Sequence, residues 1–325
     1  METALKFCKS ILPKVSRSFA LTIPMLDRDL YRPVLITYLQ DRLLDNFEDE
    51  IDSQDISLDE RMELMDQVVE LFNPASERVE GISARLKKYA PLMPENSLRQ
   101  LTENAALIRE AYDSLEESIK LSSYKWLQEM NRGMKKYLTV EIETFTDLDD
   151  YCYYVAGTVG GFLTDIILIK RELNQDDTLK LLDNFNDAGI FLPKINLVRD
   201  IKKDIKNREK NFWPLKSLGL SPEILLNPAN KELAMEALAE MLGSIKAHIS
   251  NLITYLEALP ESLSGYKRFF CVNNALGLAT IEKLENNPAV FYGNQEVKVS
   301  KLELLKILKS PERVFYEKAA SLQKV

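Results

Sequence analysis

The sequence predicts an all-α protein, and three observations support that fold class. The chain of 325 residues holds only 11 glycines and 13 prolines, the residues that most often interrupt a helix. Apolar residues recur at i, i+3 and i+4 through most of the chain, which is the spacing of an amphipathic helix. Alternation of apolar and polar residues, which is typical of a strand, is limited to a short run over 296–301.

The predicted helices follow one another with short breaks. Proline, glycine or asparagine gathers at 73–76, 90–97, 211–223 and 286–294, which predicts turns there. None of these breaks has the length or composition of a linker between domains. We therefore expect one all-α domain over residues 1–325, without a separate cofactor domain. Its helices, each with apolar residues at helical spacing, are predicted near 4–12, 31–50, 58–72, 78–90, 95–120, 124–144, 149–171, 176–206, 231–258, 262–286 and 301–323.

Composition and charge narrow the class of protein. Hydrophobic residues make up 46% of the chain, which is enough for a large core and argues against disorder. The net charge is −8 and no long basic run occurs, so we expect no nucleic-acid partner. An anionic ligand would need a local cationic pocket or a metal ion. We also expect the protein to be a monomer.

Cysteine and histidine are scarce in this sequence. The three cysteines, Cys8, Cys152 and Cys271, are far apart and form no CxxC motif. They predict neither a disulfide framework nor a thiolate zinc site. The one histidine, His248, excludes a histidine-rich metal site, and a place on a helix surface is expected for it.

The sequence contains no clear targeting signal. No signal peptide is recognisable at its start, and no uninterrupted apolar stretch reaches the roughly 18–20 residues of a membrane span. The best candidate, over 155–169, is interrupted by glycines and by Asp165. We therefore expect a cytoplasmic protein with no transmembrane anchor in this chain, and a charged, amphipathic segment over 310–325 that makes peripheral contact with a membrane.

A first group of carboxylates follows an apolar helical run in "YLQDRLLDNFEDEID", residues 38–52. Asp45 and Asp49 are four residues apart, and Glu48 lies beside the second. Like charges at this spacing repel by a few tenths of a kcal/mol, so the cluster calls for a function. One interpretation is a metal site, and the alternative is a solvated helix surface. The preceding apolar run favours a place on the floor of a cavity.

A second polar stripe lies in "NLVRDIKKD", residues 196–204. Asn196, Asp200 and Asp204 are each four residues apart and therefore share one face of a helix. Two such stripes facing each other across a helical bundle would line a cavity with oxygen ligands. Mg²⁺, or Mn²⁺, prefers such ligands and is commonly held by one or two carboxylates together with substrate phosphates.

Basic and hydroxyl side chains accompany both stripes. Arg42 precedes Asp45 by three residues, and Arg199 is next to Asp200. Guanidinium and hydroxyl groups are good donors to a diphosphate, although each arginine could instead be a surface ion-pair partner. A third group of such donors is the run Ser16, Arg17 and Ser18.

These segments resemble the squalene/phytoene synthase family. The matches span residues 16–301 in the order of the family, and they are closer to its squalene synthase branch than to phytoene synthases. The first acid motif is DNFED (45–49) and the second is NLVRDIKKD (196–204). The other matching segments are SRSFA (16–20), YCYYVAGTVGG (151–161), NFWP (211–214) and FFCVNNALGLATI (269–281).

The resemblance implies an isoprenoid-synthase helical bundle with a central cavity. It implies a prenyltransferase that joins two farnesyl diphosphates head to head, through presqualene diphosphate, to squalene. Mg²⁺ would be the metal and NADPH the reductant. The metal ligands would be Asp45, Glu48, Asp49, Asn196, Asp200 and Asp204, of which the four aspartates would also be catalytic.

The resemblance also implies roles for other residues. Tyr151 would be the catalytic tyrosine, and Tyr38 would help Ser16, Arg17, Ser18, Arg42 and Arg199 to bind diphosphate. Asn196, Lys298 and Lys301 would contact NADPH. The prenyl chains would lie against Phe19, Val155, Val159, Leu163 and Phe270, each of which could instead belong to the helix-packing core.

Glycines and departures from the family pattern add further expectations. Gly157, Gly160 and Gly161 predict the close approach of a substrate chain or a neighbouring helix, or a kink. Pro193 stands where glutamine is common and predicts a kink. KVSK at 298–301 replaces a more basic segment. This leaves open dehydrosqualene, phytoene, hydroxysqualene or presqualene diphosphate as products, and a non-catalytic scaffold protein as a less favoured alternative.

Overall fold

The computed structural model describes residues 2–16, 18–207 and 210–324. These residues form helices and connecting turns, with no strand among them, so the predicted all-α fold class is confirmed. The chain divides into two compact units, one formed by Met1–Thr139 with Phe162–Glu172 and the other by Val140–Gly161 with Leu173–Val325. The single domain expected over 1–325 stays a prediction.

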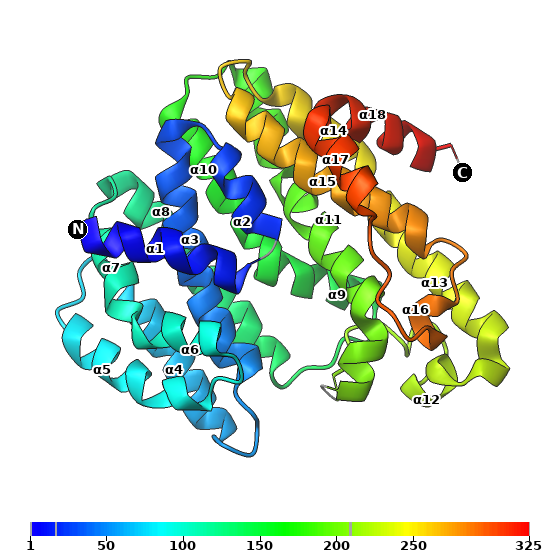
Figure 1. Cartoon of the computed structure of the whole chain (residues 1–325), viewed down its shortest axis with the longest axis horizontal. Helices are drawn as coiled ribbons and strands as arrows, with labels where there is room; N and C mark the ends of the chain where they lie inside the picture. Colours follow the sequence, from blue (N-terminus) through cyan, green and yellow to red (C-terminus); the bar gives the residue numbers. More distant parts are fainter. Residues whose placement is uncertain (1, 17, 208–209, 325) are drawn as a thin grey trace. The chain divides into compact units, whose positions relative to one another are not determined.

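The first unit contains the N-terminal helices, coloured blue to cyan-green in Figure 1. Helix α3 is its most buried long helix, because its apolar positions meet α1, α7, α8 and α4. The elements are α1 (Glu2–Val15), α2 (Ser18–Thr22), η1 (Ile23–Met25), α3 (Arg28–Asp45), η2 (Asn46–Glu50), α4 (Leu58–Leu71), α5 (Val79–Tyr89), η3 (Ala90–Leu92), α6 (Asn96–Glu103), α7 (Ala105–Asp113), α8 (Glu117–Tyr137) and the C-terminal part of α10 (Thr158–Lys170).

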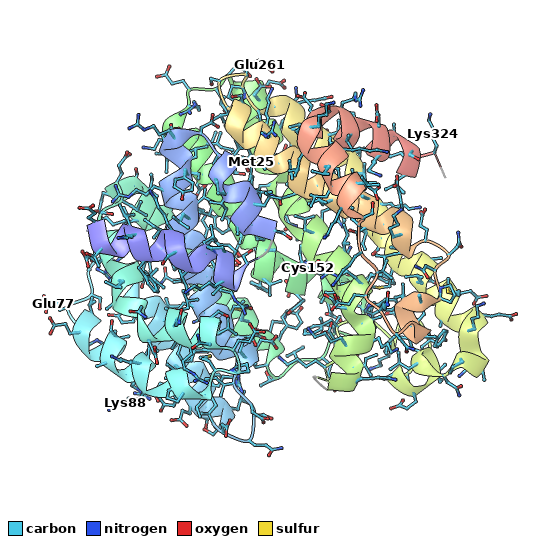
Figure 2. The ribbon with its side chains drawn as sticks, in the orientation of Figure 1. Met25, Glu77, Lys88, Cys152, Glu261 and Lys324 are labelled. Carbon is cyan, nitrogen blue, oxygen red and sulfur yellow. The ribbon has the colours of Figure 1, made fainter. Side chains whose placement is uncertain are left out.

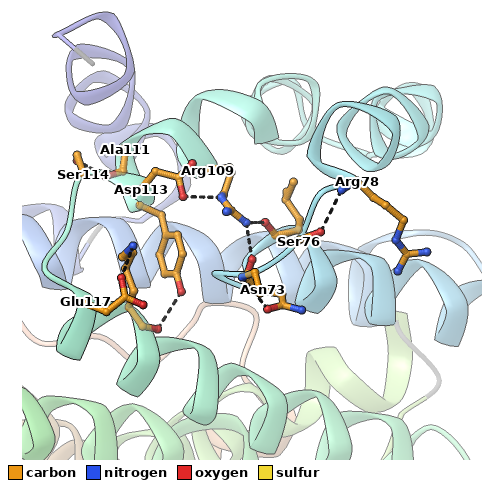
Figure 3. Close-up of polar contacts among 12 residues, drawn as sticks. Asn73, Ser76, Arg78, Arg109, Ala111, Asp113, Ser114 and Glu117 are labelled. Atoms are coloured by element: carbon orange, nitrogen blue, oxygen red, sulfur yellow. Dashed lines mark hydrogen bonds and ion pairs between the residues drawn. The ribbon is translucent and has the colours of Figure 1, made fainter.

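Buried arginines fix the ends of helices in this unit. Figure 3 shows Arg109, whose Nε donates to Asp113 at 2.7 Å and whose NH1 donates to the carbonyl of Asn73 at 2.9 Å. The same NH1 also donates to the carbonyl of Leu71. Carbonyls at the end of a helix lack partners within the helix, so Arg109 satisfies the end of α4 and joins it to α7.

The second unit contains the remaining helices. Its longest helix, α11, contacts α9, η4, α13, α14, α15 and α16. The elements are α9 (Phe145–Cys152), η4 (Tyr153–Gly157), the start of α10, α11 (Gln175–Asn207), α12 (Pro222–Leu226), η5 (Pro228–Asn230), α13 (Lys231–Lys246), α14 (Ile249–Ala258), α15 (Ser264–Leu284), α16 (Ala289–Tyr292), α17 (Lys301–Lys309) and α18 (Pro311–Leu322). Helix α11 continues through Pro193.

Glycines allow α11 to touch the helix that runs from η4 into α10. A Cβ atom added at Gly160 would lie 2.4 Å from the carbonyl oxygen of Phe185, and one at Gly189 would lie 2.6 Å from that of Ala156. One at Gly157 would lie 2.5 Å from Asn186 Oδ1. For Gly157 and Gly160, the predicted close approach of a neighbouring helix is therefore confirmed.

Several predicted helices are shorter in the structure. The run predicted over 95–120 is divided among α6, α7 and the start of α8, because the chain turns at Asn104 and again at 114–116. The run over 231–258 breaks near His248, and the run over 301–323 breaks at Ser310, where Pro311 begins α18. Apolar periodicity persisted across these breaks, so the sequence pattern alone did not reveal them.

All three cysteines are unpaired and buried. Cys152 lies in the interior of the second unit, whereas the labelled Glu261 and Lys324 of that unit are exposed (Figure 2). Burial raises the pKa of Cys8 to about 12, so its thiol stays protonated.

One helical stretch, Phe145–Lys170, is long and apolar enough to cross a membrane by length and composition. The helix is longer than the 155–169 candidate of the sequence, because α9, η4 and α10 run on without a break. More than half of its most apolar window is buried, and a buried core helix passes the same test. Asp165 in this stretch accepts hydrogen bonds from Ser122 Oγ and Trp126 Nε1, both at 2.8 Å.

Candidate functional site

The first acid motif lies where α3 gives way to a π-helical turn, η2. Hydrogen bonds in such a turn run from i to i+5, and π-helical turns are frequent at functional sites. The α-helical stripe that was expected to hold Asp45 and Asp49 is therefore interrupted after Asp45. Glu48 is buried within this turn, and Asp49 is half-buried.

Arg61 of α4 holds this turn in place. Its guanidinium donates to the carbonyls of Phe47 at 2.9 Å, Glu48 at 3.0 Å and Ile51 at 2.6 Å. The side chain is only 6% exposed, and burial lowers its pKa while the Glu48 and Asp49 carboxylates oppose that change. Sequence reasoning missed Arg61, because a single arginine 12 residues after Asp49 gives no local signal of this role.

The structure brings several predicted diphosphate ligands together beside this turn. Arg42 forms ion pairs with Asp45 and, at 2.7 Å, with Glu50. The ring of Tyr38 lies 5.4 Å from that of Phe19. Burial raises the pKa of Tyr38, and a hydrogen bond with Ser16 lowers it in part. Ser18 is exposed, and Arg17 lies outside the described residues.

Asp41 belongs to the same part of α3 and was not predicted as a site residue. Burial raises the pKa of its carboxyl to about 8, so near neutral pH a large fraction of this group is protonated. A protonated carboxyl can donate a hydrogen bond, which an ionised carboxylate cannot do. In the sequence, Asp41 stands four residues before Asp45, in the same row as Asp45 and Asp49, but this spacing gave no sign of a raised pKa.

The raised pKa of Asp41 predicts a pH-dependent stability. An aspartate in the unfolded chain ionises near pH 4, whereas Asp41 in the folded protein stays protonated until about pH 8. The free energy of unfolding is therefore unaffected by this group below about pH 4 and falls progressively as the pH rises from 4 toward 8. Replacement by Asn should remove that loss, which is at most about 1.4 kcal/mol per pH unit. Urea unfolding of both proteins at several pH values, without divalent metal, measures the difference.

A matched variant controls for the loss of a carboxylate. Asp183→Asn changes an exposed aspartate of α11 and should follow the wild type at every pH. Parallel curves for Asp41→Asn and the wild type would show that Asp41 ionises like a surface residue.

The second stripe lies along the C-terminal half of α11. Asn196 is exposed, Asp200 is half-buried and Asp204 is buried. Arg199 donates to both carboxylate oxygens of Asp200, at 2.9 and 2.6 Å, and this contact raises the pKa of Arg199. A bidentate pair of this kind fixes the orientation of both groups.

A cationic cavity of about 270 Å³ adjoins this stripe within the second unit. Lys202 Nζ donates a hydrogen bond to the carbonyl of Gly293 at 2.6 Å. This bond attaches the loop over 293–297 to α11. Lys203 and Lys206 also line the cavity, with Arg199, Asp200 and Glu296. The pKa of Glu296 is lowered, first by its ion pair with Lys298 and further by Arg199 and Lys203. The arrangement suits a phosphate group.

The NFWP segment folds back onto α11 and positions Tyr151. Trp213 is fully buried, and its Nε1 donates to the carbonyl of Leu197 at 3.0 Å. The preceding residue, Phe212, stacks on Tyr151 with ring centroids 5.1 Å apart. The predicted catalytic tyrosine is therefore buried and held by the loop that follows the second acid motif.

A buried lysine anchors the same helix two residues before Asn196. Lys194, only 1% exposed, donates to Asp149 Oδ1 at 2.6 Å, and its Nζ lies 3.1 Å from His248 Nε2. His248 Nδ1 lies 2.5 Å from Asp187 Oδ1. The expectation that His248 lies on a plain helix surface was wrong, because it joins α11 to the turn between α13 and α14.

The remaining predicted residues are placed as follows. Val155, Val159 and Leu163 are half-buried, whereas Phe270 is buried and stacks on Tyr255 with ring centroids 5.4 Å apart. Lys298 forms an ion pair with Glu296, which lines the cationic cavity. Lys301 is exposed at the start of α17. Their roles, and the expectation that the two acid stripes face each other, stay predictions.

The donor atoms of both clusters fit a hard divalent cation. Carboxylate and amide oxygens are the ligands that Mg²⁺ prefers, and each cluster offers a buried carboxylate, Glu48 or Asp204. Among the described residues, no group of three or more His, Cys, Asp or Glu side chains is arranged to hold a metal ion.

The fold is all-α and of the isoprenoid-synthase type. It carries two acid motifs, and in each motif an arginine is paired with an aspartate. Residues 12–303 match the family model for squalene/phytoene synthase. The chain belongs to the squalene/phytoene synthase family.

Named relatives agree with this assignment. The chain is 30% identical to the squalene synthase of Nicotiana benthamiana over 88% of this chain and 66% of that protein. It is 30% identical to squalene synthase 1 of Arabidopsis thaliana over 88% of this chain and 67% of that protein. The chain thus spans about two thirds of the length of these relatives.

Solved structures show the same fold. The complex of TcSQS with the ligand BPH1237 superposes with a TM-score of 0.83, at 25% identity, over 98% of this chain and 90% of that chain. A dehydrosqualene synthase in complex with a ligand superposes with a TM-score of 0.61 at 15% identity, over 100% of this chain and 98% of that chain, which shows the fold alone.

Proposed function

We propose that this protein is a prenyltransferase that condenses two farnesyl diphosphates head to head, through presqualene diphosphate, to squalene. The observation that carries the proposal is the pairing of each acid motif with an arginine in a fixed geometry, Arg42 with Asp45 and Arg199 with Asp200. Membership of the squalene/phytoene synthase family supports it.

Binding of the diphosphate is the first task of these residues. Mg²⁺, held by carboxylates of the two motifs, would supply Lewis-acid stabilisation of the leaving diphosphate. Arg42 in the first motif and Arg199 in the second would each add fixed positive charge where negative charge develops on a bound diphosphate. Because both arginines are already oriented by carboxylates, little reorganisation is needed when the allylic bond breaks.

Protection of the carbocation is the second task. Loss of diphosphate leaves an allylic cation that water would quench, so apolar side chains must exclude solvent until the new carbon–carbon bond forms. Half-buried Val155, Val159 and Leu163 suit this role. Tyr151, held against Phe212, and Tyr38, hydrogen-bonded to Ser16, are candidates to accept the proton lost in forming the cyclopropane ring.

NADPH, when bound, would supply the hydride of the second half-reaction. The cationic donors of the cavity fit the phosphate groups of this dinucleotide, because lysine and arginine are the usual partners of phosphate. We propose that Lys203 and Lys206 of α11 bind them together with Lys298. These two lysines add to Lys298 and Lys301, which the sequence predicted.

The products formed from farnesyl diphosphate test the proposed function. With Mg²⁺ and NADPH we expect squalene, and with Mg²⁺ alone we expect presqualene diphosphate or an unreduced hydrocarbon. Geranylgeranyl diphosphate in place of the farnesyl compound should be a poor substrate. Squalene absent under all conditions, with dehydrosqualene, phytoene or hydroxysqualene formed instead, would assign the chain to a different reaction of the family. No diphosphate release above an EDTA control would favour a scaffold protein.

Binding of the dinucleotide is tested separately from turnover. We expect Lys203→Ala combined with Lys206→Ala to weaken NADPH binding by about tenfold or more, since a hydrogen bond to a charged group contributes about 1.5–3 kcal/mol. Binding of NADH should change less if a lysine contacts the 2′-phosphate. The fluorescence of each reduced dinucleotide, NADPH or NADH, measures its dissociation constant.

A control lysine separates local from general charge effects. Lys231→Ala removes an exposed lysine of α13 and should leave NADPH affinity unchanged. Equal weakening by this variant would show that only the net charge matters.

A further inference from the structure

Helix α17 displays the two most exposed large apolar side chains among the residues that the structure describes. Leu302 is 74% exposed and Leu305 is 60% exposed, and they lie three residues apart on one face. Most of the surface of each leucine side chain therefore stays in contact with solvent. Exposed apolar side chains that gather on a rigid element commonly mark a surface of interaction.

The helix that carries these leucines is firmly held by the second unit. It packs against α15 and α18, as Figure 1 shows, through the fully buried Ile307. Ser300 Oγ accepts a hydrogen bond from the backbone N–H of Glu303 at 3.2 Å and caps the start of the helix. Arg268 donates to the carbonyl of Leu308 at 2.7 Å near its end. The leucines are therefore presented on a fixed support.

Charge on α17 is divided between its two faces. Its one acidic residue, Glu303, points toward the unit and pairs with Lys318 at 2.9 Å and with Lys283 at 3.6 Å. The exposed charged residues of the helix are all lysines, namely Lys301, Lys306 and Lys309. A face of leucine flanked by lysine thus stands out on a chain whose net charge is −8.

We propose that the outer face of α17 docks the protein on an anionic lipid surface. Leu302 and Leu305 would enter the boundary between headgroups and acyl chains, as in amphipathic helices that lie in a membrane interface. The lysine stems would lie along the apolar layer while their ammonium groups reach lipid phosphates. This inference does not depend on the reaction proposed above, because it uses neither acid motif.

Vesicle sedimentation tests the proposal. We expect the wild-type protein to pellet with phosphatidylcholine vesicles that contain phosphatidylserine, less with phosphatidylcholine alone, and less as salt is raised. Leu302→Glu with Leu305→Glu should weaken binding at least about tenfold, because carboxylates replace both inserted side chains. Lys306→Ala and Lys309→Ala should each weaken binding to the anionic vesicles about fivefold.

A matched control uses another exposed leucine of the same unit. Leu233 of α13 is 46% exposed and has Glu232 beside it, so Leu233→Glu should bind vesicles like the wild type. Circular dichroism checks that every variant is folded. The proposal is overturned if the wild type stays in the supernatant, or if the double leucine variant pellets equally. It is also overturned if α17 instead joins two copies, seen as a concentration-dependent dimer that the double variant abolishes.

Discussion

Asp200→Ala should lower turnover by about 100- to 1,000-fold while the protein remains folded. Effects of this size follow the removal of one group that stabilises charge in a transition state. Asp200 orients Arg199 through two hydrogen bonds and is a proposed metal ligand, so its loss would disturb both sources of positive charge around the diphosphate. Asp49→Ala in the first motif should have an effect of the same order.

Folding should change little in Asp200→Ala, because the carboxylate and its arginine are both partly solvated. Partly exposed pairs contribute about 0–1 kcal/mol to stability. The matched control is Asp183→Ala, an exposed aspartate earlier on α11, which should retain wild-type turnover. Diphosphate release, set beside urea unfolding of each variant, measures both properties. Unfolding of Asp200→Ala with unchanged activity per folded molecule would show that the acid has a structural role.

Gly189→Ala should destabilise the protein by about 3 kcal/mol, although alanine is ordinarily the better helix former. Its Cβ would lie 2.6 Å from the carbonyl oxygen of Ala156 and 2.7 Å from the Cα of Gly157, and both are backbone atoms. Backbone atoms cannot rotate away as a flexible side chain can. The two helices would have to separate, which disturbs the packing that places α11 against η4.

Gly243→Ala provides the opposite expectation. Gly243 lies in α13, and a Cβ atom there would meet nothing within 4 Å. The same chemical change should therefore raise stability, by up to about 1 kcal/mol. Urea unfolding of the two variants measures the contrast. A gain in stability for both would mean that the crossing of α11 and η4 is looser than these distances indicate.

Features with a strong local signal were predicted from the sequence. The all-α class follows from apolar spacing, and the helix crossing follows from glycines inside an apolar helix, where only close approach or a kink justifies their cost. The second acid stripe is also local, because i,i+4 spacing on an α-helix places Asn196, Asp200 and Asp204 on one face. These inferences needed only residues within a few turns of one another.

Features that depend on distant contacts were not predicted. The π-helical turn after Asp45 is held by Arg61, which reaches it from another helix. The place of Lys203 in a cavity depends on the loop that Lys202 attaches to α11 through its hydrogen bond with Gly293. His248 had no local sign of its pairing with Asp187 in α11. Such contacts arise from tertiary packing, which periodicity does not encode.

The dependence of the first acid motif on Arg61 bears on engineering. Residues 45–49 transplanted into a helix of another scaffold would keep their carboxylates but lose the π-helical turn that orients them. That turn depends on Arg61 of α4, which donates hydrogen bonds to three carbonyls in the turn and directly after it. The smallest portable unit is therefore a helical hairpin that includes both α3 and α4.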